Sequence, residues 1–133
     1  MNAIILDTDV ASNIIKGKLD PRMAVQLVGH DLVISFITLG ELTQWVELRQ
    51  WGPHRRETLA KFLDGRAVLP GSKAVATTWG SVCAEATRNG QPRPVNDSWI
   101  AACCLTYRLP LATFNVKDYS YFRDRHSLSL ITV

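Results

Sequence analysis

Short apolar runs alternate with segments of helical spacing along this chain, and that alternation restricts the fold more than any other feature. The runs are AIILD (3–7), LVISFIT (32–38), AVLP (67–70) and PLATFN (110–115). Each is bounded by turn or helix signals and lacks polar alternation, so each is expected to be a strand that is covered on both faces. Strands of this kind, separated by helices, predict a three-layer α/β fold with a mostly parallel central sheet flanked by helices. SLSLITV at the end of the chain is a candidate edge strand.

The segments between the strands carry helix signals of their own. We expect helices over Val10–Lys16, over residues 39–51, over Arg55–Asp64, after Ser72, and over 98–107. Gly52 and Pro53 close the helix over residues 39–51, and Ser72 is suited to cap the helix that follows it. Segments 90–97 and 116–126 are expected to be loops.

The composition is that of an ordinary globular protein. The chain has 133 residues, of which 47% are hydrophobic and 20% charged, so we expect a single domain over residues 1–133. Cys83, Cys103 and Cys104 are odd in number and have no C-x-x-C spacing, which favours reduced, buried thiols. Trp45, Trp79 and Trp99 are expected to pack in the core because they occur at helical spacing.

The chain shows no signal for secretion or membrane insertion. The N-terminus has no basic region, and no apolar run approaches the roughly 18 residues that a membrane span requires. Together with the cysteines, this predicts a cytoplasmic location and no membrane partner. A net charge of +3 permits a polyanionic partner without requiring one.

Acidic residues occur near the carboxyl ends of the predicted strands. Asp7 and Asp9 follow AIIL, Glu41 follows LVISFIT, Asp97 precedes an apolar helix, and Asp118 follows PLATF. Parallel strands end at one edge of a sheet, where ligands bind, so we expect these five carboxylates to share a cleft. Like charges in one cleft repel one another unless a cation lies among them.

Capping is the alternative explanation for each acid, since helix N-termini favour Asp, Asn, Ser and Thr. Thr38 to Glu41 fits a capping box, Asp97 could cap the apolar helix, and Asn115 or Asp118 could cap a turn. Serine or threonine would cap equally well without accumulating charge, so the acids taken together favour a metal site. Oxygen ligands suit Mg²⁺, with Mn²⁺ as a plausible substitute, and such an ion can activate water for hydrolysis of a phosphodiester.

Four segments, LDTD, GELTQ, VNDSWIAA and LATFNVKDY, occur in this order across nearly the whole chain. As an ordered set they resemble the PIN-domain ribonucleases, specifically the VapC toxins of bacterial toxin–antitoxin pairs. The resemblance implies a magnesium-dependent endoribonuclease, a homodimer, an RNA substrate, and a VapB-type antitoxin that blocks the acidic pocket. The implied reaction is hydrolysis of RNA that leaves a 5′-phosphate and a 3′-hydroxyl, with no protein nucleophile.

The resemblance also assigns residues, with Asp7, Glu41 and Asp97 as catalytic metal ligands. Asn115 and Asp118 both lie in the segment that supplies the fourth acidic position, and we prefer Asp118 because it carries charge. Asp9 stands where many relatives have Asn or Ser, and it either supports a ligand or is an extra charge. Thr8 and Thr113 either orient a water or a carboxylate or serve as caps.

The densest basic and aromatic stretch is LRQWGPHRR, in which Arg49, Trp51, Arg55 and Arg56 are candidates for RNA binding through phosphate contacts and base stacking. The alternative is a helix end that carries favourable cations.

Two other functions also fit parts of the sequence. IILDTDV matches the nucleophile motif of haloacid-dehalogenase-like phosphatases, in which Asp7 would accept the phosphoryl group. The other alternative is a non-catalytic RNA-binding module with the same fold.

Overall fold

The computed structural model describes residues 2–133 and contains a five-stranded, entirely parallel sheet in the order β3-β2-β1-β4-β5. The strands are β1 (Ala3–Leu6), β2 (Asp31–Ser35), β3 (Val68–Leu69), β4 (Leu111–Ala112) and β5 (Leu130–Ile131). The predicted three-layer α/β fold is confirmed, and SLSLITV does contribute an edge strand. Because all strands run in one direction, their carboxyl ends lie along a single edge of the sheet.

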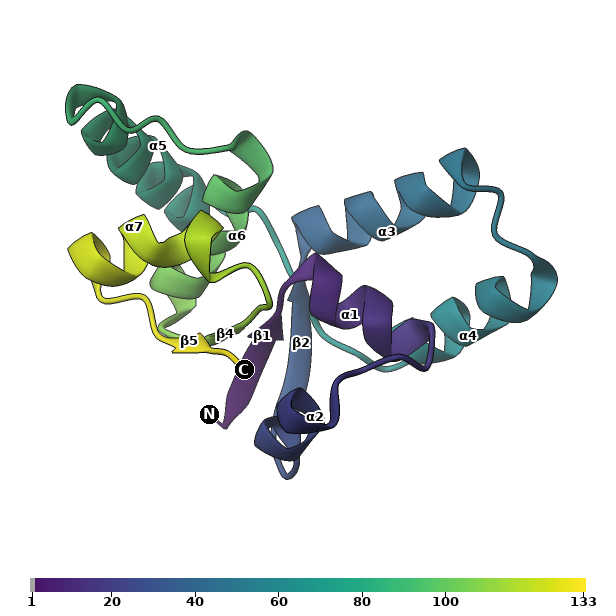
Figure 1. Ribbon diagram of the computed structural model, residues 1–133. Coiled ribbons are helices and arrows are strands. Elements are labelled where there is room, and N and C mark those ends of the chain that lie inside the picture. The colour runs from purple at the N-terminus through teal and green to yellow at the C-terminus, as the bar shows by residue number, and fades with distance from the viewer. Residues whose placement is uncertain (1) are drawn as a thin grey trace.

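The helices are α1 (Thr8–Ile15), α2 (Pro21–Leu27), α3 (Phe36–Leu48), α4 (Pro53–Leu63), α5 (Lys73–Arg88), α6 (Val95–Tyr107) and α7 (Val116–His126). Figure 1 shows α5, α6 and α7 on one side of the sheet and α1, α3 and α4 on the other, with α3 and α4 extending away from the strands. None of the helices formed by residues 2–133 has the length and apolar character needed to cross a bilayer.

The two layers of helices are held by the two faces of β1. Ala3 and Ile5 pack into a cluster with α5, α6 and α7, whereas Ile4 and Leu6 pack into a cluster with α1 to α4. All four side chains are buried, as expected of a strand covered on both faces. Cys103 and Cys104 are buried free thiols, which confirms their predicted core placement.

Several predicted boundaries were wrong, each for a local reason. The second strand ends at Ser35, three residues earlier than predicted, because the Ser35 hydroxyl caps α3 by accepting a hydrogen bond from the Thr38 amide at 3.2 Å. Thr38 therefore lies inside the helix, and the predicted capping box from Thr38 to Glu41 does not form. The first turn of α3 carries the apolar, partly buried Phe36 and Ile37 directly after the strand, so apolar character alone could not separate the two elements.

Three helical segments extend beyond or lie outside the predicted ones. Helix α6 begins at Val95 and not at residue 98, so Asp97 lies in its first turn and is not its cap. Residues 116–126 form α7 and not a loop, with Tyr119, Tyr121 and Phe122 buried on one face. Helix α2, which was not among the predicted helices, is capped by the side chain of Asp20.

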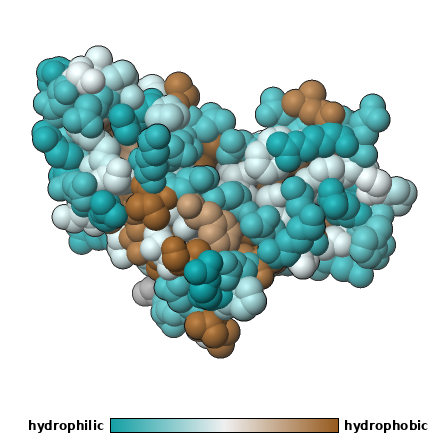
Figure 2. All heavy atoms as spheres, viewed as in Figure 1, coloured by the Kyte–Doolittle hydropathy of each residue, from teal (hydrophilic) through white to brown (hydrophobic). Residues whose placement is uncertain are grey.

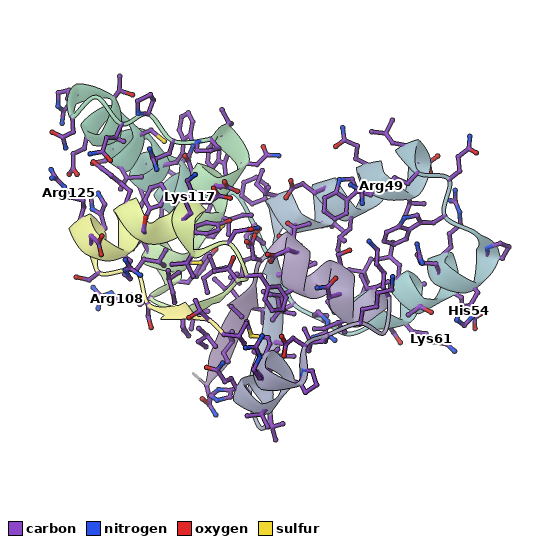
Figure 3. The ribbon with its side chains drawn as sticks, viewed as in Figure 1. Arg49, His54, Lys61, Arg108, Lys117 and Arg125 are labelled. Carbon is purple, nitrogen blue, oxygen red and sulfur yellow. The ribbon has the colours of Figure 1, made fainter. Side chains whose placement is uncertain are left out.

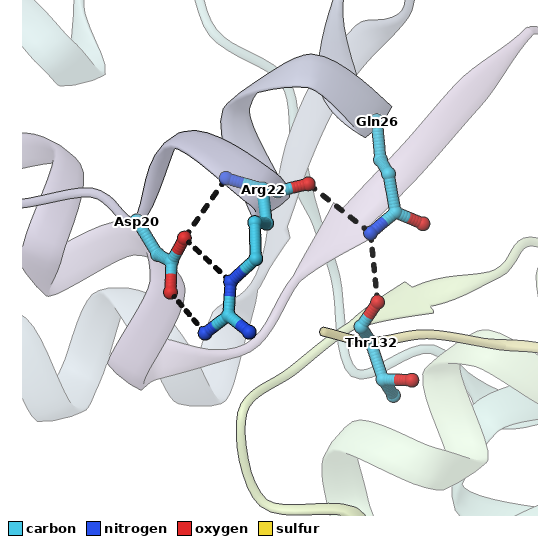
Figure 4. A network of polar contacts seen from close by, with 4 residues as sticks. All are labelled: Asp20, Arg22, Gln26 and Thr132. Atoms are coloured by element: carbon cyan, nitrogen blue, oxygen red, sulfur yellow. Dashed lines mark hydrogen bonds and ion pairs between the residues drawn. The ribbon is translucent and has the colours of Figure 1, made fainter.

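Helix α2 also secures the end of the chain. Figure 4 shows the Asp20 carboxylate binding the Arg22 side chain, while the Gln26 amide donates to the carbonyl of Thr132 at 2.7 Å. The large apolar side chains that remain exposed are Val25, Val28, Leu48, Val95 and Val133. Val25 and Val28 lie three residues apart at the end of α2, and Figure 2 shows hydrophobic spots on a mostly hydrophilic surface. In the same view the surface is hollowed between the α5–α6 side and α3.

Candidate active site

Asp7 lies where β1 ends, and its carboxylate is almost completely enclosed. The side chain accepts hydrogen bonds from the Thr8 amide at 2.8 Å and from the Thr113 hydroxyl at 2.7 Å. The first bond makes Asp7 the N-cap of α1, and the second links it to the segment after β4. Asp7 is only 5% exposed, so capping and burial in a cleft, which the sequence offered as alternatives, both apply to this residue.

Tyr119 joins Asp7 to Asp97, and sequence reasoning did not identify it as a site residue. Its hydroxyl lies 3.0 Å from Asp7 Oδ1 and 3.3 Å from Asp97 Oδ1. One phenol proton cannot serve both carboxylates fully, so this fully buried hydroxyl lies between two acceptors that repel each other. The signal in the sequence was its place directly after Asp118, but that segment had been interpreted as a loop.

Glu41 is connected to Asp7 through the neighbouring threonine. The Thr8 hydroxyl is 2.7 Å from Glu41 Oε1 and 2.9 Å from the Thr38 hydroxyl, and the Asn96 amide donates to Glu41 Oε2 at 3.3 Å. Helices α1, α3 and α6 are therefore tied together around Glu41. Thr8 and Thr113 both bind carboxylates. The Thr113 hydroxyl also accepts a hydrogen bond from the Asn115 backbone amide at 2.9 Å, just before α7, so it orients a carboxylate and caps the chain at the same time.

Asp9 has a different environment from Asp7. Its Oδ1 accepts from the Val10 amide at 2.7 Å, and its Oδ2 accepts from the Phe114 amide at 3.1 Å and the Asn115 side chain at 3.0 Å. Both oxygens therefore bind the chain itself. Asp9 fastens the start of α1 to the loop between β4 and α7, which carries Thr113 and leads into the helix that carries Tyr119.

The acids influence one another electrostatically. Burial raises the pKa of Asp7, and the charge of Glu41 adds to this effect, while the hydrogen bonds from Thr113, Thr8 and Tyr119 oppose it. Burial, followed by the charges of Asp7, Asp118 and Glu41, raises the pKa of Asp97 to about 6. Burial and the charge of Asp7 raise the pKa of Asp9 to about 7. Each of the five acids is thus close enough to at least one other for their charges to interact.

The donors suit a hard divalent cation in kind. All are carboxylates, and a cation among them would offset both the burial and the repulsion that raise the pKa values of Asp7 and Asp97. Within residues 2–133, no three acidic, histidine or cysteine side chains are close enough to hold one ion as they stand. Mg²⁺ commonly binds one or two carboxylates and keeps several waters, so this spacing is compatible with it.

The basic stretch lies at the end of α3 and the start of α4, where Figure 3 labels Arg49 and His54. The Arg49 guanidinium lies over Trp45 at 4.3 Å, and that of Arg55 lies over Trp51 at 5.4 Å. Trp51 is only 5% exposed and packs in the core, so little of its ring is available for a base to stack on. Arg56 donates from Nε to the carbonyl of Trp51 at 2.7 Å, which gives it a structural contact.

Comparison with known proteins agrees with this geometry. The PIN domain profile matches residues 4–121, a span that contains every acid of the site. The chain belongs to the PIN-domain family. Its sequence is 28% identical to ribonuclease VapC4 of Mycobacterium tuberculosis over 123 residues, which cover 90% of this chain and 91% of the relative.

Solved structures show the same PIN fold in toxin–antitoxin complexes. VapBC2 of Rickettsia felis bound to a DNA fragment from its promoter contains a chain that matches with a TM-score of 0.83 and 21% identity over 98% of both chains. VapBC-5 of Mycobacterium tuberculosis, a member of the VapBC family of toxin–antitoxin systems, matches with a TM-score of 0.77 and 25% identity over 100% of both chains. A VapC ribonuclease is thus similar to this chain over 90% of its length, and chains of VapBC complexes share its fold over nearly all of it.

Proposed function

We propose that this PIN domain is a divalent-metal-dependent endoribonuclease that acts in the cytoplasm as the toxin of a VapBC-type pair. The observation that carries the proposal is the linked set of carboxylates at the carboxyl edge of the sheet. Asp7 and Asp97 share the Tyr119 hydroxyl, and Glu41 is tied to them through Thr8. A set of mutually repelling acids is costly for a protein that only binds RNA, because it also repels phosphate.

Asp7, Glu41, Asp97 and Asp118 are the residues proposed to hold Mg²⁺, for which Mn²⁺ could substitute. Asp118 is preferred over Asn115 because its charge raises the pKa of Asp97, whereas the Asn115 amide is bound to Asp9. A divalent ion bound there supplies charge neutralisation at the phosphate and lowers the pKa of a water enough for it to act as a nucleophile.

The protein side chains have defined parts in this chemistry. Thr113 and Thr8 fix the orientation of Asp7 and Glu41 through bonds of 2.7 Å each, so the carboxylates need little rearrangement during the reaction. Tyr119 holds Asp7 and Asp97 at a fixed separation. Water is the proposed nucleophile, and the products are a 5′-phosphate and a 3′-hydroxyl.

The phosphatase alternative receives no support from the geometry. A phosphatase that used Asp7 as its nucleophile would leave Glu41 without a part in the reaction, although the Thr8 hydroxyl ties Glu41 to the site at 2.7 Å. The relatives add to the nuclease proposal, since the curated relative is named a ribonuclease and the solved ones are VapBC complexes. By the same likeness, we propose a VapB-type antitoxin as partner and a homodimer as the assembled form.

The experiment that tests the proposal is incubation of the purified protein, free of antitoxin, with total bacterial RNA in Mg²⁺ or Mn²⁺. Discrete cuts are expected, and they should disappear in EDTA and in the Asp97→Asn variant. Asp64→Asn is the matched control because Asp64 is an exposed acid at the end of α4. RNA binding without any cut in either metal would instead support a non-catalytic RNA-binding module, and full activity of Asp97→Asn would refute the assignment of the site.

A further inference from the structure

An open groove of about 410 Å³ lies beside Glu41, on the side of the site formed by α3 and the start of α6. Its lining residues are Phe36, Ile37, Gly40, Glu41, Gln44 and Asn96. The groove therefore shares Glu41 with the proposed catalytic site, and Asn96 contacts the same carboxylate at 3.3 Å. A group bound in it would lie directly next to the reacting phosphate.

The apolar wall of the groove is held rigidly from behind. The Phe36 ring meets the Trp99 ring edge to face at 5.7 Å, and Trp99 is stacked on Trp79 at 4.4 Å. Gly71 lies so close that a Cβ atom there would be 2.9 Å from the Phe36 ring. Phe36 is nevertheless only partly buried, so the ring is fixed in place while part of it faces the groove.

Gly40 lines the groove without a side chain. It lies inside α3, where a glycine lowers helix stability by about 0.5–1 kcal/mol relative to alanine. A Cβ atom at this position would meet nothing within 4 Å, and the backbone is not left-handed. Neither packing nor backbone conformation requires this glycine, so the space that it leaves is available to a ligand.

Two amides complete the lining. Gln44 is exposed and carries both a donor and an acceptor. Asn96 uses its NH₂ group on Glu41, which leaves its carbonyl oxygen as an acceptor. A flat, neutral group with donors and acceptors on its edge matches an apolar wall flanked by amides, whereas a phosphate would be repelled by Glu41.

We propose that this groove binds one unpaired nucleobase adjacent to the cleaved phosphate and thereby sets the sequence preference of cutting. The base contacts Phe36 and Ile37 with its faces and the Gln44 and Asn96 amides with its edge. Recognition of single-stranded RNA typically combines stacking with hydrogen bonds to base edges in this way. The inference rests on the proposed ribonuclease function, because it assigns the base to the RNA that the site would cut.

The test is to fill the groove from Gly40 and to compare the result with the same change elsewhere. Gly40→Leu places a bulky side chain in the groove, and Gly80→Leu is the matched control, since Gly80 also lies inside a helix, is exposed, and has nothing within 4 Å of a built Cβ. Both variants are expected to be at least as stable as the wild type to thermal unfolding, because leucine favours a helix more than glycine does. Gln44→Ala is a second, smaller perturbation, with the exposed Thr43→Ala on the same helix as its control.

Two readouts separate this inference from the proposed function. The first is cleavage of a randomised RNA pool, with the base frequencies next to each cut determined by sequencing. The second is binding, in EDTA, of short single-stranded RNAs that differ in one base, measured by fluorescence anisotropy. Gly40→Leu is expected to remove the base preference in both and to weaken binding of the preferred RNA by about tenfold, equivalent to about 1.4 kcal/mol and within the range for stacking one base.

Each result has a defined meaning. An unchanged preference in Gly40→Leu and Gln44→Ala, or an equal loss in Gly80→Leu, overturns the inference even if the wild type cuts RNA. If the wild type binds RNA and cuts none, the proposed ribonuclease fails, but a binding preference that Gly40→Leu removes still supports a base-binding groove. If wild-type binding also shows no base preference, the groove is not a nucleobase site.

Discussion

Replacing Tyr119 with phenylalanine removes a single hydroxyl group from the site. Tyr119 is fully buried, and its hydroxyl lies 3.0 Å from Asp7 and 3.3 Å from Asp97. Phenylalanine retains the ring and its packing, so the variant removes only the group that connects the two carboxylates. The structure therefore predicts different effects on folding and on metal binding.

The effect on folding is expected to be small because two contributions oppose each other. Loss of a hydrogen bond to a charged group destabilises a protein by roughly 1.5–3 kcal/mol, whereas removing a buried hydroxyl relieves a desolvation penalty of roughly 1–3 kcal/mol. Asp7 also retains its hydrogen bonds from Thr8 and Thr113. We expect the free energy of unfolding to fall by about 1 kcal/mol, which corresponds to a few degrees in Tm.

The effect on metal binding is expected to be much larger. Groups that orient metal-binding carboxylates typically change metal affinity by about 10–100-fold when they are removed. Tyr119→Phe should therefore weaken Mn²⁺ binding at least about tenfold, measured by isothermal titration calorimetry, and raise the Mg²⁺ concentration needed for half-maximal cleavage by a similar factor. High Mg²⁺ should restore most of the activity.

Tyr121→Phe is the matched control on the same helix. Tyr121 is also buried, and its hydroxyl contacts a carboxylate, that of Glu85 at 2.8 Å, away from the proposed metal site. It should lose comparable stability and bind Mn²⁺ as the wild type does. Wild-type Mn²⁺ affinity in Tyr119→Phe, or equal losses in both variants, would refute the reasoning that this hydroxyl positions Asp7 and Asp97.

Two further predictions concern charge. Because the pKa of Asp97 is raised from 3.8 to about 6, the folded chain between these pH values holds a proton that the unfolded chain has lost. The free energy of unfolding of the metal-free protein should therefore fall as pH rises through this window. Urea denaturation in EDTA should show a smaller fall for Asp97→Asn than for the wild type. Equal falls in the two proteins would contradict the raised pKa of Asp97. Arg49→Gln and Arg55→Gln should weaken RNA binding. They should also lower the slope of log affinity against log salt concentration by about one for each phosphate that the variant no longer binds. An unchanged slope would indicate that these cations only stabilise the helix ends.

The fold could be predicted because its strands are short and buried on both faces. AIIL and PLATF leave few alternatives to central parallel strands, and the acids that follow them necessarily lie at one edge. The boundary between β2 and α3 could not be predicted, since VISFIT is apolar in both elements and only the Ser35 cap separates them. Helix α7 was missed because its sequence VKDYSYFRDRH is mostly polar and its buried face consists of Tyr119, Tyr121 and Phe122.

The sequence also could not separate the roles of Asp7 and Asp9, which are one residue apart in LDTD. In the first turn of a helix, residues two apart point in different directions, so each acid meets a different neighbour. Asp7 faces Thr113 and Tyr119 inside the site, whereas Asp9 binds the backbone of Phe114 and the Asn115 side chain. Both acids thus contact the segment after β4. Asp9 accepts hydrogen bonds from its backbone, and Asp7 accepts hydrogen bonds from its hydroxyl groups. Spacing along the chain predicts that acids gather at this edge, but only the partner loop decides which groups each of them binds.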